Sequence, residues 1–169
     1  MSRSADVTPS AAPSKPEPLY FWEDFPVGQV REFGGKRMEA DEIVGFASAY
    51  DPQPFHLSEE GGQASLFGGL CASGWHTCAV TMRMMCDHYL LDSASLGSPG
   101  LESLKWLKPV FPGDVLRVRM TVLEARRMNS KPDVGLLRTQ HEVFNQHDEA
   151  VLRMESWAMM RRREGRAPA

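Results

Sequence analysis

Two short stretches of this sequence carry side chains that could exchange protons with a bound molecule. In the first, Asp51 and His56 lie five residues apart, with Pro52 and Pro54 between them. The second, residues 72–76, has a serine and a glycine at the start of an apolar segment. Imidazole and carboxylate groups are common acids and bases near neutral pH, and amides at a helix N-terminus stabilise negative charge. Together the two stretches predict an acid–base site at the start of a helix.

The reactive side chains near this pair have simpler interpretations. Ser73 is expected to cap the helix, because it lacks the flanking glycine of a nucleophile elbow and has no assigned base. His76 lies within the apolar helix, where a packing role is expected. The spacing of Cys71, His76 and Cys78 does not match known zinc sites. Asp51 on its own is also typical of a residue that ends a helix, and only its pairing with His56 favours a functional role.

The composition is that of an ordinary globular protein. The 169 residues are 42% hydrophobic and 24% charged, with a formal net charge of −3, so nucleic acid is not an expected partner. No apolar run approaches the roughly 18 residues that span a bilayer, and the N-terminus lacks the hydrophobic segment of a secretory signal. Three cysteines without C-x-x-C spacing favour free thiols. These features predict a cytoplasmic protein.

The chain divides into one domain and two tails. Residues 1–18 are rich in Ser, Ala and Pro and are expected to form a disordered N-terminal tail. Residues 19–160 are expected to form a single domain, which is large enough to bury a core. Residues 161–169 are expected to form a basic, solvated C-terminal tail.

The first half of the domain predicts helices around the candidate pair. Residues 39–50 form an amphipathic pattern, with an apolar stripe at Ile43, Phe46, Ala47 and Tyr50. Prolines then end the helix, so residues 51–57 are expected to be extended and non-helical. Residues 58–65 predict a short helix capped by Ser58.

A longer helix is predicted over residues 74–89, with Ser73 as its N-cap. It is apolar nearly all round, which indicates burial within the fold. The face expected to point inward consists of Trp75, Cys78, Ala79, Met82, Met85, Cys86 and Tyr89.

The second half of the domain predicts strands. Alternating apolar residues over 116–122 give a half-buried strand, and further strands are expected at 29–37, 101–107, 136–144 and 150–160. A hairpin turn is expected at 146–149. The fold class is therefore α+β, with an antiparallel sheet wrapped around one long central helix, which is the arrangement of a hot-dog fold.

Three motifs in this order resemble the MaoC-like, (R)-specific enoyl-CoA hydratase family. They lie at residues 50–56, 73–76 and 106–114, and the resemblance covers roughly residues 20–160. It implies that Asp51 and His56 act on a water molecule that adds to a trans-2-enoyl-CoA. The family usually has Asn where Gln53 stands and often His where Ser73 stands, which suggests a subgroup with its own substrate.

In that chemistry His56 is the expected base, while Asp51 orients the water and supplies the proton to the α-carbon. Amides near Gly74 are expected to polarise the thioester carbonyl, with Ser73 also in the substrate-binding region. Acyl-CoA is then the substrate, and no separate cofactor is expected. The resemblance and the exposed sheet edge both predict a homodimer or a larger homo-oligomer.

Two other functions remain open on the sequence alone. An acyl-CoA thioesterase of the same fold commonly has an acidic residue on or beside the long helix, but here the helix offers only Arg83 and Asp87 as charges. Asp87 lies 13 residues beyond Gly74, or about 20 Å along an α-helix. A non-catalytic protein that binds acyl-CoA is the third alternative, and the intact Asp51 and His56 pair argues against it.

Overall fold

A computed structural model describes residues 17–163 of the chain. Helices and strands follow in the order η1 (Trp22–Asp24), β1 (Val30–Arg37), α1 (Ala40–Tyr50), α2 (Pro54–Leu57), α3 (Glu59–Gln63), α4 (Gly74–Met85), the π-turn η2 (Cys86–Leu90), β2 (Ser95–Trp106), β3 (Val115–Met128), β4 (Lys131–Phe144) and β5 (Ala150–Arg161). The predicted disordered tail falls almost wholly outside the described residues.

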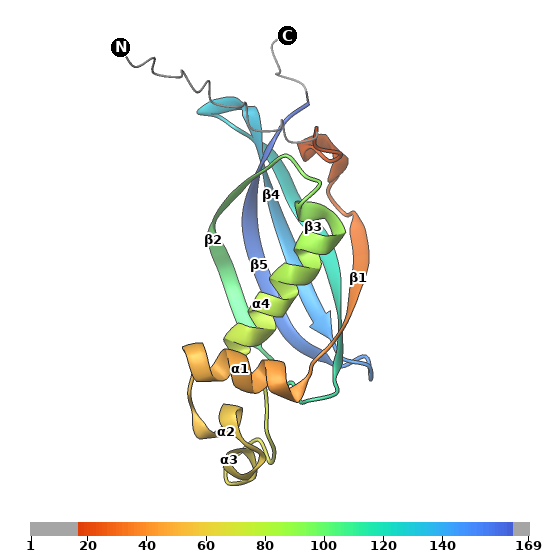
Figure 1. Cartoon of the computed structure of the whole chain (residues 1–169). Coiled ribbons are helices and arrows are strands. Elements are labelled where there is room, and N and C mark those ends of the chain that lie inside the picture. The colour runs from red at the N-terminus through yellow and green to blue at the C-terminus, as the bar shows by residue number, and fades with distance from the viewer. Residues whose placement is uncertain (1–16, 164–169) are drawn as a thin grey trace, which may run out of the picture.

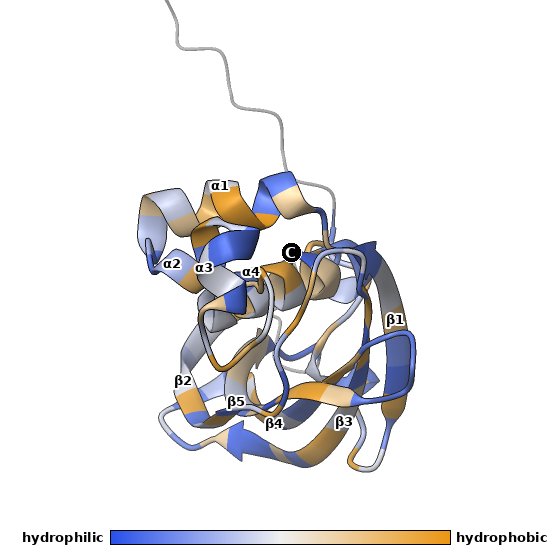
Figure 2. Cartoon of the chain, turned by 90° about the horizontal axis from the view of Figure 1, so that it is seen from below, coloured by the Kyte–Doolittle hydropathy of each residue, from blue (hydrophilic) through white to orange (hydrophobic). Residues whose placement is uncertain are grey.

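The five strands form one antiparallel sheet that curls around α4 (Figure 1). The strand order is β1-β3-β4-β5-β2, so β1 and β2 are the two edges. Helices α1, α2 and α3 gather at the end of the sheet where α4 begins, as the view along the molecule also shows (Figure 2). The predicted α+β hot-dog arrangement of a sheet around a long helix is confirmed.

Alternation along β3 builds the centre of the core. Leu116, Val118, Met120 and Val122 are almost completely buried beneath α4. The arginines between them face the opposite side of the sheet, where Arg119 pairs with Glu32 of β1 at 2.7 Å. A period of two residues thus places one face of the strand in the core and the other in water.

The predicted buried face of the long helix is confirmed only in part, because Met85 and Tyr89 are buried but other members of that face are not. Trp75 and Met82 are 58% and 48% exposed, whereas Thr77, Val80 and Thr81 pack inward. The threonine hydroxyls donate to carbonyls one turn earlier, Thr81 to Thr77 at 2.8 Å, so they enter the core with their hydrogen bonds satisfied. Hydropathy alone does not register that a threonine whose hydroxyl is bonded within its own helix can be buried.

Two further sequence predictions need correction. Tyr50 was expected on the buried stripe of α1 but is 76% exposed. Arg162 was expected in a solvated tail but is buried, because its guanidinium donates to the Pro132 carbonyl at 2.7 Å and lies over the Trp22 ring. The end of β5 is therefore fastened to η1 at the far end of the sheet from α1.

Candidate active site

The loop that joins α1 to α2 brings Asp51 and His56 together. Asp51 caps the end of α1, where its N–H donates to the Ala47 carbonyl at 2.9 Å. Gln53 is extended, as predicted for a residue before proline, but the prediction that the whole segment is non-helical is wrong. Pro54 starts α2, because its fixed φ suits the first turn. An N–H group at this position would have no intrahelical acceptor, so proline loses no hydrogen bond by lacking one. This turn folds His56 back towards Asp51.

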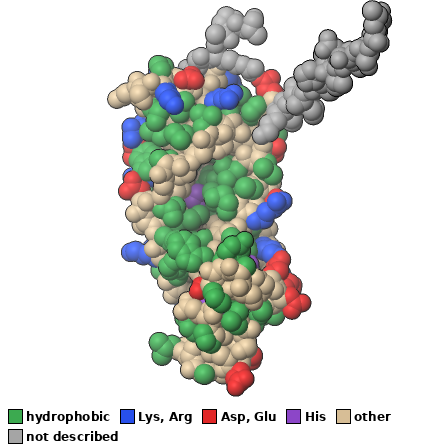
Figure 3. Space-filling view, turned by 60° about the vertical axis from the view of Figure 1, so that its left-hand side comes forward, with side chains coloured by type: hydrophobic (Ala, Val, Ile, Leu, Met, Phe, Trp, Pro, Cys, Tyr) green, Lys and Arg blue, Asp and Glu red, His purple; other side chains and the backbone are tan. Residues whose placement is uncertain are grey.

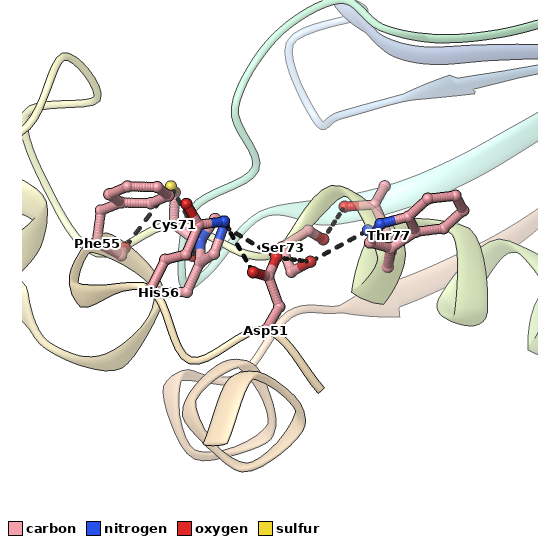
Figure 4. A network of polar contacts seen from close by, with 8 residues as sticks. Asp51, Phe55, His56, Cys71, Ser73 and Thr77 are labelled. Carbon is pink, nitrogen blue, oxygen red and sulfur yellow. Dashed lines mark hydrogen bonds and ion pairs between the residues drawn. The ribbon is translucent and has the colours of Figure 1, made fainter. Parts of the chain in front are cut away.

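The imidazole of His56 is held at both nitrogens. Its Nδ1 lies 2.8 Å from the Cys71 carbonyl oxygen, and its Nε2 lies 3.5 Å from Oδ2 of Asp51 (Figure 4). A carbonyl only accepts hydrogen bonds, so we assign the Nδ1 proton to that contact. In the neutral ring Nε2 then carries a lone pair that faces the carboxylate side of the site. The ring itself is buried.

Asp51 receives one hydrogen bond on each carboxylate oxygen. The Ser73 hydroxyl donates to Oδ2 at 2.6 Å, and the Gln53 side-chain amide donates to Oδ1 at 2.8 Å. The Ser73 bond, followed by the Gln53 bond, holds the pKa of the Asp51 carboxyl below its ordinary value, although partial burial opposes this shift. Asp51 is therefore a carboxylate at neutral pH.

Ser73 joins this carboxylate to the start of α4. It is the N-cap, as predicted, and its Oγ accepts from the Trp75 N–H at 3.2 Å while donating to Asp51 (Figure 4). The donation to Asp51 was not predicted, because the two residues are separated by 22 positions and no local pattern relates them. The hydroxyl proton is committed to the carboxylate, which also argues against Ser73 as a nucleophile.

Gly74 is the first residue of α4, and none of the hydrogen bonds found within residues 17–163 uses its amide. A Cβ at this position would lie 2.5 Å from the Trp106 ring, so the Trp106 indole covers this α-carbon. Trp106 in turn packs edge-on against Trp75, with ring centroids 5.3 Å apart. Glycine was expected here for close approach of a substrate, but in this fold it is the indole that requires it.

Of the other polar groups nearby, the Cys71 thiol contacts His56, whereas no hydrogen bond found in the described residues joins His76 to the pair. His76 is buried and stacks on Phe46 at 4.8 Å, and burial lowers its pKa. The Cys71 thiol lies 3.6 Å from Nδ1 of His56, but burial raises its pKa to about 11, so it is a neutral thiol. In the described part of the chain, no three His, Cys, Asp or Glu side chains gather to hold a metal ion.

The four predicted site residues, Asp51, His56, Ser73 and Gly74, thus come together where α1, α2 and α4 meet. Sequence reasoning did not assign roles to the Cys71 carbonyl, the Gln53 amide or Trp106. Gln53 and Trp106 lie within the motifs that carried the resemblance, but nothing in the spacing of those motifs indicated which group each side chain would contact.

A sheet around a helix, with a carboxylate and an imidazole at the helix start, defines a hot-dog protein with a candidate acid–base site. Residues 24–143 match the family described as "MaoC like domain", and the chain belongs to that family. A solved MaoC-like dehydratase from Rhodospirillum rubrum is 42% identical, with a TM-score of 0.80 over 85% of this chain and 98% of that one.

Two other relatives extend the comparison. Mesaconyl-CoA hydratase from Cereibacter sphaeroides is 45% identical over 65 residues, which are 38% of this chain and only 19% of that protein. An R-hydratase from Pseudomonas aeruginosa is 22% identical, with a TM-score of 0.68 over 88% of this chain and 94% of that one. The latter likeness concerns the fold alone.

None of the helices within residues 17–163 is long and apolar enough to cross a membrane.

Proposed function

We propose that this protein is a hydratase or dehydratase that adds water to, or removes it from, a 2-enoyl-CoA or 3-hydroxyacyl-CoA thioester. Membership of the MaoC-like family supports the reaction class. The observation that carries the proposal is the contact between His56 Nε2 and Asp51 Oδ2, beside the unused amide of Gly74. The proposed reaction is of the (R)-specific enoyl-CoA hydratase type.

His56 is the proposed base and acid. With its proton on Nδ1, the neutral ring accepts a proton from water at Nε2 as the water oxygen bonds to the β-carbon. The π electrons of the double bond move towards the thioester, which becomes an enolate. The imidazolium then returns the proton from Nε2 to the α-carbon, so water has been added and the enzyme is unchanged.

Asp51 is the proposed electrostatic partner of that imidazolium. Hydrogen bonds from Ser73 and Gln53 favour its ionised form, which makes it a poor proton donor. We therefore assign to His56 the α-carbon proton that the sequence-based interpretation gave to Asp51. The negative carboxylate, 3.5 Å from Nε2, would stabilise the charged ring between the two proton transfers.

Gly74 is the proposed donor to the thioester oxygen. Its amide lies at the positive end of α4, where a developing oxyanion is stabilised by both the N–H group and the helix dipole. By comparison with other oxyanion holes, one such donor contributes about 3 kcal/mol to lowering the barrier. Coenzyme A is part of the substrate in this scheme, and no separate cofactor takes part.

Thioester hydrolysis is less well supported by the charges on the long helix. Arg83 and Asp87 bond to each other at 3.0 Å and are exposed, so Asp87 is engaged away from the helix start. A protein that only binds acyl-CoA would not require the polar contacts that hold both nitrogens of His56. Neither thioester hydrolysis nor binding alone accounts for the contact of the Asp51 carboxylate with His56 and its hydrogen bonds from Ser73 and Gln53.

The reaction is tested with purified protein and a short trans-2-enoyl-CoA such as crotonyl-CoA. Loss of enoyl absorbance and release of free thiol are followed in parallel samples. Absorbance loss without thiol supports hydration, whereas thiol release without prior hydration would contradict it. Mesaconyl-CoA belongs in the substrate panel because 65 residues are similar to a hydratase named for it.

We also propose a homodimer, formed through the side of α4 that faces away from the sheet and the neighbouring edge of β2. Figure 3 shows hydrophobic side chains gathered over this face. The large exposed apolar residues of α4, β2 and the adjoining loop are Trp75, Met82, Leu96, Leu101, Trp106 and Leu107. A patch of this kind at an unpaired strand edge favours a second copy of the same chain.

The dimer is tested by sedimentation of wild type and Leu101→Asp, with Leu66→Asp as a control. Leu66 is fully exposed and lies in the loop after α3, whereas Leu101 is 52% exposed. We expect dimers for wild type and the control, and monomers for Leu101→Asp. A monomeric wild type at micromolar concentration would contradict the proposal.

A cytoplasmic location is proposed as well, in keeping with the free thiols of Cys71, Cys78 and Cys86.

A further inference from the structure

Gln53 contacts both members of the candidate pair. Its backbone N–H donates to the Asp51 carbonyl at 2.7 Å, and its own carbonyl accepts from the His56 N–H at 2.9 Å. Its side-chain amide reaches back to Oδ1 of Asp51 at 2.8 Å. One residue thus makes three hydrogen bonds across the five-residue interval that separates the carboxylate from the imidazole.

The side-chain bond has a different role from the two backbone bonds. The backbone bonds shape the turn and would remain with any side chain that tolerates the extended conformation of residue 53, at φ −80° and ψ 142°. The amide instead fixes the rotation of the Asp51 carboxylate, because it holds Oδ1 while Oδ2 faces Ser73 and His56. This bond is exposed, but its acceptor is charged, and hydrogen bonds to charged acceptors are among the stronger ones in proteins.

We infer that Gln53 is a positioning residue for the hydration reaction, acting through Asp51 rather than on the substrate. This inference rests on the proposed function. Its amide orients the carboxylate so that Oδ2 faces the imidazole, and it favours the ionised form of Asp51 throughout the cycle. Without that donor the carboxylate can rotate and accept a proton more readily, which weakens its support of the His56 imidazolium.

Gln53→Met tests this role because methionine has a similar length and no donor. Gln63→Met is the matched control, since Gln63 makes the same type of bond to a different carboxylate, Glu59, at 3.0 Å. Gln53→Glu adds a second variant, in which a carboxylate replaces the donor and repels Asp51. All three variants keep the backbone hydrogen bonds of their positions.

Two readouts are measured for each protein. The first is the carboxyl titration of Asp51 by carbon-13 NMR, and the second is the rate of hydration of crotonyl-CoA, separated into kcat and KM. We expect Gln53→Met to raise the Asp51 titration midpoint and to lower kcat by about tenfold with little change in KM, as loss of one charge-assisted hydrogen bond allows. Gln53→Glu should raise the Asp51 titration midpoint and lower kcat further, whereas Gln63→Met should change neither quantity.

The two readouts separate this inference from the proposed function. A wild-type protein that hydrates no enoyl-CoA would overturn the function, and with it any role for Gln53 in that reaction. An active wild type, together with an unchanged kcat or an unchanged Asp51 titration in Gln53→Met, would overturn the inference alone. Equal effects in Gln53→Met and Gln63→Met would also overturn it, because a general loss of stability would then explain both.

Discussion

His56 and His141 are both buried imidazoles, yet their surroundings differ in every other respect. His56 contacts a backbone carbonyl at Nδ1 and a carboxylate at Nε2. His141 lies on β4 among the apolar side chains under α4, where its Nε2 is 3.4 Å from the Tyr89 hydroxyl and its Nδ1 has no partner. Burial lowers the pKa of His141 to about 4, so this ring is neutral under ordinary conditions.

The difference shows that burial alone does not make a histidine functional. A proton-transferring imidazole needs partners that fix its tautomer and stabilise its charged form, and His56 has both. His141 has neither a carboxylate nor a carbonyl among its hydrogen-bond partners, so protonation there would place an uncompensated charge in the core. We therefore expect changes at His56 to alter rate and changes at His141 to alter stability.

The largest expected effect is on turnover. His56→Ala removes the proposed base, and Asp51→Asn removes the charge that stabilises the imidazolium. Each should lower kcat/KM for crotonyl-CoA by at least about 100-fold, the range for positioned acid–base groups. Circular dichroism should show both variants folded. Near-normal turnover in either variant would remove the distinction between the two histidines.

The next largest effect should follow from Gly74→Ala. The added methyl group would lie 2.5 Å from the Trp106 ring, so the indole or the first turn of α4 must move. We expect kcat/KM to fall by about tenfold and the free energy of unfolding by about 1–3 kcal/mol, as for other overpacked sites. Adding Trp106→Ala should restore part of both losses.

Gly45→Ala is the control for that substitution. Gly45 lies within α1 and has nothing within 4 Å of an added Cβ, so alanine should leave the rate unchanged and stabilise the helix by up to about 1 kcal/mol. If Gly74→Ala behaved like Gly45→Ala, the tight contact with Trp106 would have no role in the site.

His76 offers a third buried imidazole and a smaller expected effect. It stacks on Phe46 but does not contact the pair, so His76→Ala should lower the free energy of unfolding by about 1–2 kcal/mol through lost packing, with little effect on kcat. His76→Phe keeps an aromatic ring and should recover most of that stability. A folded but inactive His76→Ala would mean that the catalytic histidine has been misassigned.

The smallest effect at neutral pH is expected at His141, where the signature is pH dependence. Its folded-state pKa of about 4 lies below the ordinary 6.5, so the unfolded chain binds more protons between those values. The free energy of unfolding should therefore fall as pH drops from 6.5 towards 4, by about 1.4 kcal/mol per pH unit where the effect is full. Urea unfolding of wild type and His141→Leu measures this.

The leucine variant should lose that contribution to the pH dependence. His147→Gln, in the exposed β4–β5 hairpin, is the control and should retain it. If the free energy of unfolding had the same pH dependence in wild type and His141→Leu, His141 would titrate alike in the folded and unfolded states. That result would contradict the expectation that burial lowers its pKa.

Patterns of short range account for the features that could be predicted. Alternation identified β3, the serine–glycine pair identified the start of α4, and the proline-spaced acid and imidazole identified the candidate site. Features that depend on distant packing were not accessible. The Ser73 bond to Asp51, the Trp106 ring over Gly74 and the burial of Thr77 and Thr81 all depend on segments far apart in sequence.

Hydration catalysed by His56 can be followed through the mass of the coenzyme A product formed from crotonyl-CoA in water labelled with oxygen-18. With wild type we predict an intact thioester that is heavier by one molecule of labelled water, and with His56→Ala almost none of this product. Free coenzyme A together with a labelled carboxylic acid would contradict it. So would equal amounts of the heavier thioester from both proteins.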